Sequence, residues 1–180
     1  MNRKNQTVNL VMTGLCIAIG IVLPMAFHSV PNAGSVILPM HIPVLLCGLI
    51  CGPIYGLASG ILTPALSSLL TQMPPMAYLP SMLCELAIYG LVAGLAIRLI
   101  RTKSNVANVY LSLVAAMLCG RLIYGVVNAL IFQAGRYSME LWLTASFVTA
   151  LPGIIIQLVA IPVLVLLLQK AGLIRSVQNA

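Results

Sequence analysis

Six long apolar segments follow one another along the chain, separated by short stretches that contain polar residues, glycine or proline. A helix needs roughly 20 such residues to cross the hydrocarbon core of a bilayer. The pattern predicts helices over residues 8–27, 36–51, 54–70, 79–100, 107–132 and 141–169. The second predicted helix carries Pro39 and Pro43, which favour a kink or partial break. With the third, it would also suit a re-entrant hairpin.

Composition agrees with this pattern. Of the 180 residues, 61% are apolar and 6% are charged, whereas a soluble domain carries roughly a quarter charged residues. We therefore predict an all-α integral membrane protein, folded as a single domain of six transmembrane helices over residues 1–180. The helices account for nearly the whole length, so no separate ATPase or other catalytic module is expected.

Basic residues give the orientation. The net charge of +7 does not indicate nucleic-acid binding, because the basic residues stand singly at the edges of apolar runs. If both ends are cytoplasmic, only Arg136 falls in an outer loop, as the positive-inside rule requires. The basic residues on the cytoplasmic side are then Arg3, Lys4, Arg98, Arg101, Lys103, Lys170 and Arg175.

Two charged residues are predicted to lie at membrane depth. Glu85 falls roughly 9 Å and Arg121 roughly 16 Å below the outer surface, at about 1.5 Å per helical residue. Charges at such depth are costly and normally face the bundle interior with a partner or a function. Two interpretations follow: a buried Glu85–Arg121 ion pair that fixes helix packing, or a substrate cavity that includes the pair.

Other polar residues favour a cavity that opens to the outside. Arg121, Tyr124 and Asn128 share one stripe of their helix, beside the space left by Gly125. Candidate substrate-binding residues are Arg121, Asn128, Tyr124, Glu85, Tyr89, His41 and Gln157. His28 and His41, which flank the first outer segment, either touch a ligand or cap helices. Two histidines without a third ligand give little support for a metal site, and we expect none.

The second outer loop and the first helix each carry a further signal. Met73, Pro74 and Pro75 form an apolar loop, which fits either a lid over a pocket or a rigid connector. Gly14 and Ala18 are one turn apart, which allows close packing against a partner subunit or the protein's own helices. The five cysteines lie inside apolar stretches and are interpreted as small packing residues.

The chain resembles the substrate-binding (S) components of prokaryotic energy-coupling factor vitamin transporters, over nearly its whole length. Within them it is most similar to the pantothenate-type branch, whose neighbours bind folate, cobalamin or riboflavin. The stretches that carry the resemblance are Pro39–Leu46, Gly48, Gly52–Pro53, Gly56, Pro64, Ser67–Leu70, Met73–Pro75, Glu85–Leu86 and Tyr89–Gly90.

The resemblance implies a mechanism. Such a component captures its vitamin from outside, between the outer halves of its helices in the plasma membrane. It then joins a transmembrane coupling subunit and two cytoplasmic ATPases, and it topples to release the vitamin inside without a cofactor. The family's small-residue motif for the coupling subunit maps onto Gly14 and Ala18, although Gly14 and Cys16 stand where alanines are usual. Its lid maps onto residues 71–78.

Two other classes of function compete with transport. A membrane enzyme using Glu85 or the histidines is disfavoured, because the chain has no aspartate and no clustered His/Glu motif. A scaffold would not need Arg121, Tyr124 and Asn128 aligned on one interior stripe.

The orientation can be tested by cysteine labelling in whole cells. Cysteines placed within residues 102–104 should be protected from impermeant thiol reagents, whereas cysteines at Ala134 or Gly135 should react. The opposite pattern would reverse the topology, and with it the assignment of every loop.

Overall fold

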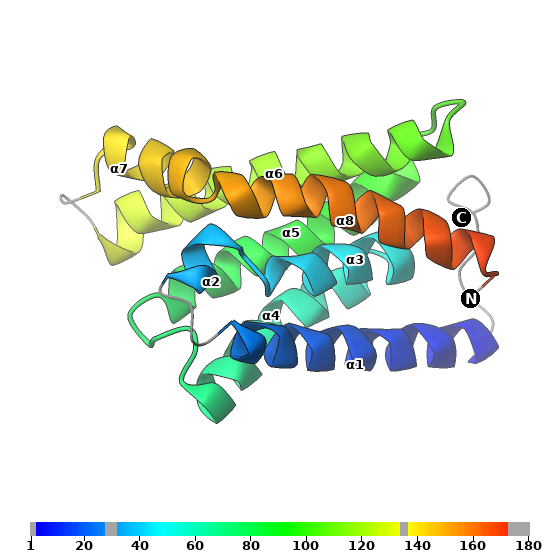
Figure 1. Ribbon diagram of the computed structural model, residues 1–180, viewed down its shortest axis with the longest axis horizontal. Coiled ribbons are helices and arrows are strands. Elements are labelled where there is room, and N and C mark those ends of the chain that lie inside the picture. The colour runs from blue at the N-terminus through cyan, green and yellow to red at the C-terminus, as the bar shows by residue number, and fades with distance from the viewer. Residues whose placement is uncertain (1–2, 28–31, 134–136, 173–180) are drawn as a thin grey trace.

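The computed structural model describes residues 3–27, 32–133 and 137–172 (Figure 1). Its helical elements are α1 (Arg3–Ala26), α2 (Ala33–Val36), α3 (His41–Cys51), α4 (Pro53–Thr71), α5 (Leu79–Leu99), α6 (Asn105–Val127), the π-helical turn η1 (Asn128–Phe132), α7 (Met139–Leu143), a second π-helical turn η2 (Thr144–Thr149) and α8 (Leu151–Lys170). No strand occurs in these ranges.

Six segments are long and apolar enough to cross a membrane, which confirms the predicted number within the described ranges. They are Gln6–Ala26, Gly34–Cys51, Pro53–Thr71, Leu79–Leu99, Asn105–Phe132 and Leu151–Lys170. The start of α1, the connection from α5 to α6 and the end of α8 lie at the same end of the bundle (Figure 1). His28, Arg136 and Arg175 lie outside the described residues.

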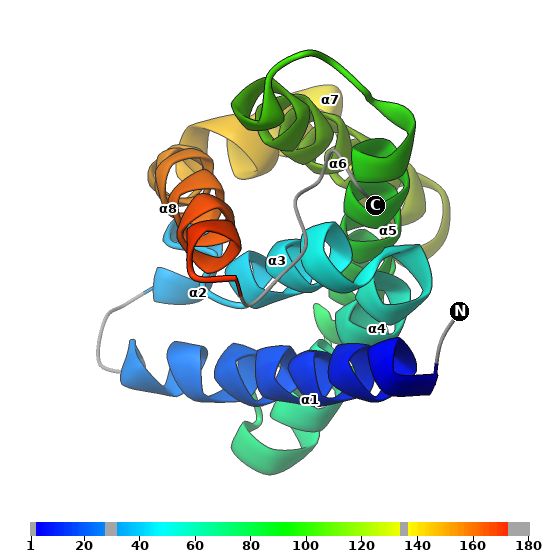
Figure 2. The same cartoon turned by 90° about the vertical axis from the view of Figure 1, so that its right-hand side faces the viewer.

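The short helix α3 is the centre of the bundle. It packs against α1, α4, α5, α6 and α8, and most of its residues are buried. Val44 and Leu45 are fully buried in a core that α5, α6 and α8 complete. Seen along the bundle, α8 is nearly end-on, while α1 runs across the view beneath α3, with one end of α4 extending below it (Figure 2). Helix α1 therefore crosses α8 obliquely.

Two predicted helices are interrupted. The helix predicted over 36–51 breaks between α2 and α3, where Leu38 has a φ of 54° and Pro39 has no N–H to donate. The helix predicted over 141–169 was wrong as one continuous element. It begins at Met139, passes through η2 and turns at Ala150 before α8, because Pro152 cannot donate to the carbonyl four residues earlier.

Glycines bring α3, α4 and α5 into backbone contact. A Cβ added at Gly90 would collide with the backbone of Gly56, and one added at Gly48 would collide with the carbonyl of Gly90. A Cβ at Gly60 would likewise meet the carbonyl of Leu86. Small residues at these crossings let membrane helices approach closely, so that packing and not hydrophobicity holds the three helices together.

Three cysteines join α1 to α3. Cys16, Cys47 and Cys51 are buried together, and the Cys47 thiol lies 3.6 Å from the hydroxyl of Thr13. All are free thiols. Their position inside the bundle fits the interpretation as packing residues.

We predict that Gly90→Ala destabilises the isolated protein by about 1–3 kcal/mol, because the new methyl group overpacks the contact with Gly56. The measurement is reversible unfolding in mixed micelles. Gly14→Ala is the control, because nothing lies within 4 Å of a Cβ built there. Equal stability of the two variants would contradict backbone contact between α4 and α5.

Candidate functional site

Three ionisable side chains from three helices meet inside the bundle. Arg121 Nη1 of α6 lies 3.0 Å from Glu85 Oε1 of α5, and His41 Nε2 at the start of α3 lies 3.7 Å from the same oxygen. Their exposed fractions are 6%, 3% and 2% respectively. The ion pair that sequence reasoning offered as one alternative is therefore present, and His41 joins it.

Helix packing explains why these groups meet. The break at residues 37–40 places His41 at the first position of α3, facing α5. The ring of Tyr89, one turn from Glu85, packs edge-on against the His41 imidazole with centroids 5.2 Å apart. Gly120 makes room for that ring, since a Cβ there would collide with it.

Buried polar atoms without a hydrogen-bond partner among the described residues occur in the cluster and elsewhere in the bundle. In the cluster they include Arg121 Nε and Nη2, both nitrogens of His41 and the hydroxyl of Tyr89, while Ser146 and Gln157 are further unpaired residues in the bundle. Leaving such an atom unsatisfied costs about 1–3 kcal/mol, and folded proteins pair nearly all of them. The unpaired nitrogens of Arg121 and His41 lie next to the carboxylate of Glu85, which marks this cluster as a candidate binding site.

Asn128 is placed differently from the other candidates. Its Oδ1 accepts a hydrogen bond from Ser81 Oγ at 2.8 Å, and its Nδ2 donates to the Tyr124 carbonyl at 2.8 Å. It is buried and ties the start of η1 to α5. Tyr124 is half-buried on the same stripe.

Gln157 reaches the core from α8. Gly153, one turn earlier, lies so close to the backbone of Val36 and Ile37 that a Cβ would crowd their carbonyls. One turn advances about 5–6 Å along a helix. Gln157 therefore lies about that distance farther along α8 than the level at which Gly153 meets the break between α2 and α3. It is fully buried with no partner for its amide.

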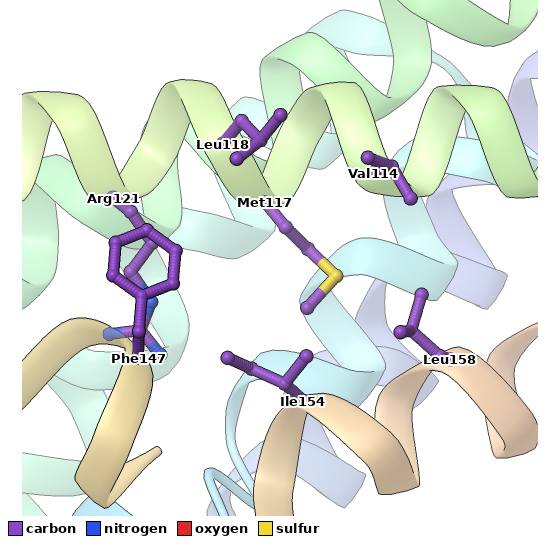
Figure 3. Close-up of a pocket in the computed structure, with 7 residues that line it drawn as sticks. All are labelled: Val114, Met117, Leu118, Arg121, Phe147, Ile154 and Leu158. Atoms are coloured by element: carbon purple, nitrogen blue, oxygen red, sulfur yellow. The ribbon is translucent and has the colours of Figure 1, made fainter. Parts of the chain in front are cut away.

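A cavity of about 140 Å³ lies between α6 and α8 next to the ion pair. Figure 3 shows Met117 and Arg121 pointing from α6 toward α8, where Ile154 and Leu158 face them. The remaining lining residues are Val114, Leu118 and Phe147. Arg121 is the single charged residue of this lining, so one face of its guanidinium meets Glu85 while the side chain also borders an apolar space.

Helix α7 and η2 cover this part of α6. Trp142 Nε1 donates to the Arg121 carbonyl at 3.0 Å, and its indole fills the space beside Gly125. Phe147 packs edge-on against Trp142 with centroids 5.6 Å apart. Sequence reasoning missed both aromatic residues, although Gly125 on the polar stripe and the chain's single tryptophan were available signals.

Tyr137, which lies outside the membrane spans, has a hydroxyl whose pKa depends on the charges of Glu85 and Arg121. Burial and the negative charge of Glu85 raise the pKa of its hydroxyl, and Arg121 partly opposes that rise. The hydroxyl has no hydrogen-bond partner in the described part of the chain. Tyr137 therefore belongs to the electrostatic surroundings of the pair from the end of the bundle.

The predicted lid residues lie in the connection from α4 to α5. Ser68 Oγ donates to the Pro74 carbonyl at 2.9 Å, which anchors the loop to the end of α4. Met73 and Pro74 are half-buried, and Pro75 is exposed. The role of the loop as a lid stays a prediction.

The two rows of small residues on α1 face different sides of the helix. Cys16 and Gly20 face the protein's own helices, and a Cβ at Gly20 would collide with Thr63 of α4. Gly14 and Ala18 are exposed on the opposite side. In the described residues, no group of three or more His, Cys, Asp or Glu side chains is placed to hold a metal ion.

Comparison with known proteins gives one result. The sequence profile of the family described as "ECF transporter, substrate-specific component" matches residues 8–165. No curated protein and no solved structure matches the chain significantly.

Proposed function

Because the chain belongs to the family of ECF transporter substrate-specific components, we propose that it captures pantothenate from outside the cell for ATP-driven uptake. Members of this family are membrane-embedded, substrate-binding transport subunits and not enzymes, and partner ATPases hydrolyse the ATP. The vitamin's identity is the new part of the proposal.

The observation that carries it is the free edge of Arg121. Nη1 pairs with Glu85, while Nε and Nη2 have no partner in the described residues. Guanidinium presents its N–H groups as a rigid planar fork, and it holds a carboxylate through two parallel hydrogen bonds. Pantothenate brings one carboxylate, and the unpaired edge of Arg121 binds it.

The other unpaired groups match the rest of that vitamin. The amide of Gln157 and the hydroxyls of Tyr89 and Ser146 bond its amide and hydroxyl groups. The apolar walls formed by Met117, Phe147 and Ile154 contact its methyl groups. Tyr124 and Asn128 contact the vitamin nearer the outer face. To bind it, Asn128 exchanges its hydrogen bond with Ser81 for one with the ligand.

Entry requires a covering element to move. The cavity of about 140 Å³ is smaller than the ~300–1,000 Å³ of typical small-molecule pockets. In this proposal the loop with Met73, Pro74 and Pro75 opens together with α7 and η2 at the outer face, and closure over the vitamin excludes water.

The orientation and partners complete the proposal. Both ends of the chain face the cytoplasm of a prokaryotic cell, and the ion pair lies in the outer half of the bundle. The family association is with a transmembrane coupling component and the ATPases of an ECF module. The exposed Gly14 and Ala18 of α1 form the contact with the coupling component.

We predict that Arg121→Ala lowers affinity for pantothenate by roughly 30- to several-thousand-fold, because removing one partner of a buried charged contact costs ~2–5 kcal/mol. Arg121→Lys should restore only part of it, since lysine lacks the planar fork. Pantothenol, which has an alcohol in place of the carboxylate, should bind the native protein far more weakly. The measurement is calorimetric titration of purified protein.

A folded Arg121→Ala protein that binds pantothenate normally would make Arg121 a structural counter-ion of Glu85. An uncharged vitamin such as riboflavin, or a large one such as cobalamin, would then fit the site better than pantothenate. Folate, which also carries carboxylates, would be disfavoured by the same result.

We predict that Gly14→Trp or Ala18→Trp blocks vitamin uptake by the complete transporter but leaves binding to the isolated chain intact. A bulky side chain on this exposed face separates the two subunits without touching the protein's own core. Val159→Trp, on the exposed face of α8, is the control and should leave uptake intact. Loss of binding in the α1 variants would instead place this face in the protein's own fold.

A further inference from the structure

We infer that the site binds a proton together with its anionic substrate, and that His41 holds that proton. The inference rests on the proposed function, because it concerns the charge balance of the same buried cluster. It follows from three observations: the number of charges in the cluster, their burial, and the two unpaired nitrogens of His41.

Without substrate, the cluster is neutral. Arg121 carries a permanent positive charge, and Glu85 at 3.0 Å carries the compensating negative charge. A neutral imidazole at His41 completes a net charge of zero. This arrangement suits an environment in which the three side chains are almost inaccessible to solvent.

A bound carboxylate disturbs this balance. The ligand's carboxylate on the free edge of Arg121 adds one negative charge, so the closed cluster would hold two anions and one cation. An uncompensated charge of this kind costs several kcal/mol in a low-dielectric interior. Taking up one proton restores neutrality without moving a helix.

His41 is the group placed to accept that proton. Its Nε2 is 3.7 Å from Glu85 Oε1, so an imidazolium gains a carboxylate neighbour as soon as it forms. Neither ring nitrogen has a hydrogen-bond partner among the described residues. Histidine is also the side chain that changes charge most readily near neutral pH.

Glu85 of α5 is the other group in the cluster that can accept a proton, and protonating it would give up its ion pair with Arg121 at 3.0 Å. Helix α5 contributes Glu85 and Tyr89, and α6 contributes Arg121 beside the half-buried Tyr124. In the described parts of α1, α4 and α8, the ionisable side chains near α3 are Cys16 and Tyr55, which pack with Cys47 and Cys51 farther along α3. Lys170 is the last residue of α8, at the far end of the bundle.

Calorimetric titration of the full-length protein in buffers of different ionisation enthalpy tests the inference. Pantothenate binding near neutral pH should take up about one proton, and affinity should rise up to about tenfold for each unit by which pH falls. Pantothenol, which is uncharged, should bind without proton uptake.

Two variants separate the roles in the cluster. His41→Gln should bind pantothenate with proton uptake near zero, because glutamine cannot be protonated. Glu85→Gln should also remove proton uptake although His41 is intact, because Arg121 and the ligand then balance each other. Ser112→Ala, a buried hydroxyl change elsewhere on α6, should keep both the affinity and the proton uptake of the native protein.

Each result decides the question. Pantothenate binding without proton uptake would overturn the inference and leave the proposed function standing. Undiminished proton uptake by folded His41→Gln would also overturn it, since the proton would then rest on another group. If pantothenate fails to bind but nicotinate or biotin binds with proton uptake, the vitamin is wrong and the inference holds. If no carboxylate vitamin binds, both are wrong.

Discussion

The ion pair between Glu85 and Arg121 constrains everything around it, because neither charge is tolerable alone at this depth. Removing one partner of a buried pair typically costs ~3–5 kcal/mol. At 3.0 Å the pair fixes the depth of α5 relative to α6, and His41 brings α3 to the same oxygen. One carboxylate thus holds α3, α5 and α6 against one another.

Glycine contacts make this alignment possible. Arginine and glutamate side chains pair directly only when their helices lie close, and Gly120 opens α6 to the Tyr89 ring of α5. On the other side, Gly90 meets Gly56 backbone to backbone. The central α3 is short and mostly buried, and its first residue, His41, lies inside the bundle instead of at a membrane surface.

Hydropathy was sufficient to predict six spans, because length and apolar content alone determine what can cross a bilayer. Counting about 1.5 Å per helical residue from the predicted helix ends was sufficient to predict that Glu85 and Arg121 lie in the same half of the membrane. Tertiary contacts determined the rest. The bond from Ser81 to Asn128 and the packing of Trp142 on Gly125 each join residues on different helical elements. A periodicity of 3.6 residues cannot reveal either one.

In the proposed function, burial also determines how the site would select its ligand. The cavity wall is apolar apart from Arg121, so the charge of Arg121 would set the sign of the ligand's charge and the apolar walls would limit its size. The face of α1 proposed for the coupling component lies one helix away. Gly20 on the inner side of α1 packs near Pro43, two residues from His41. In the proposed function, a partner that displaces α1 therefore acts on α4 and on the helix that carries His41, and through His41 on the charge balance that would hold an anion.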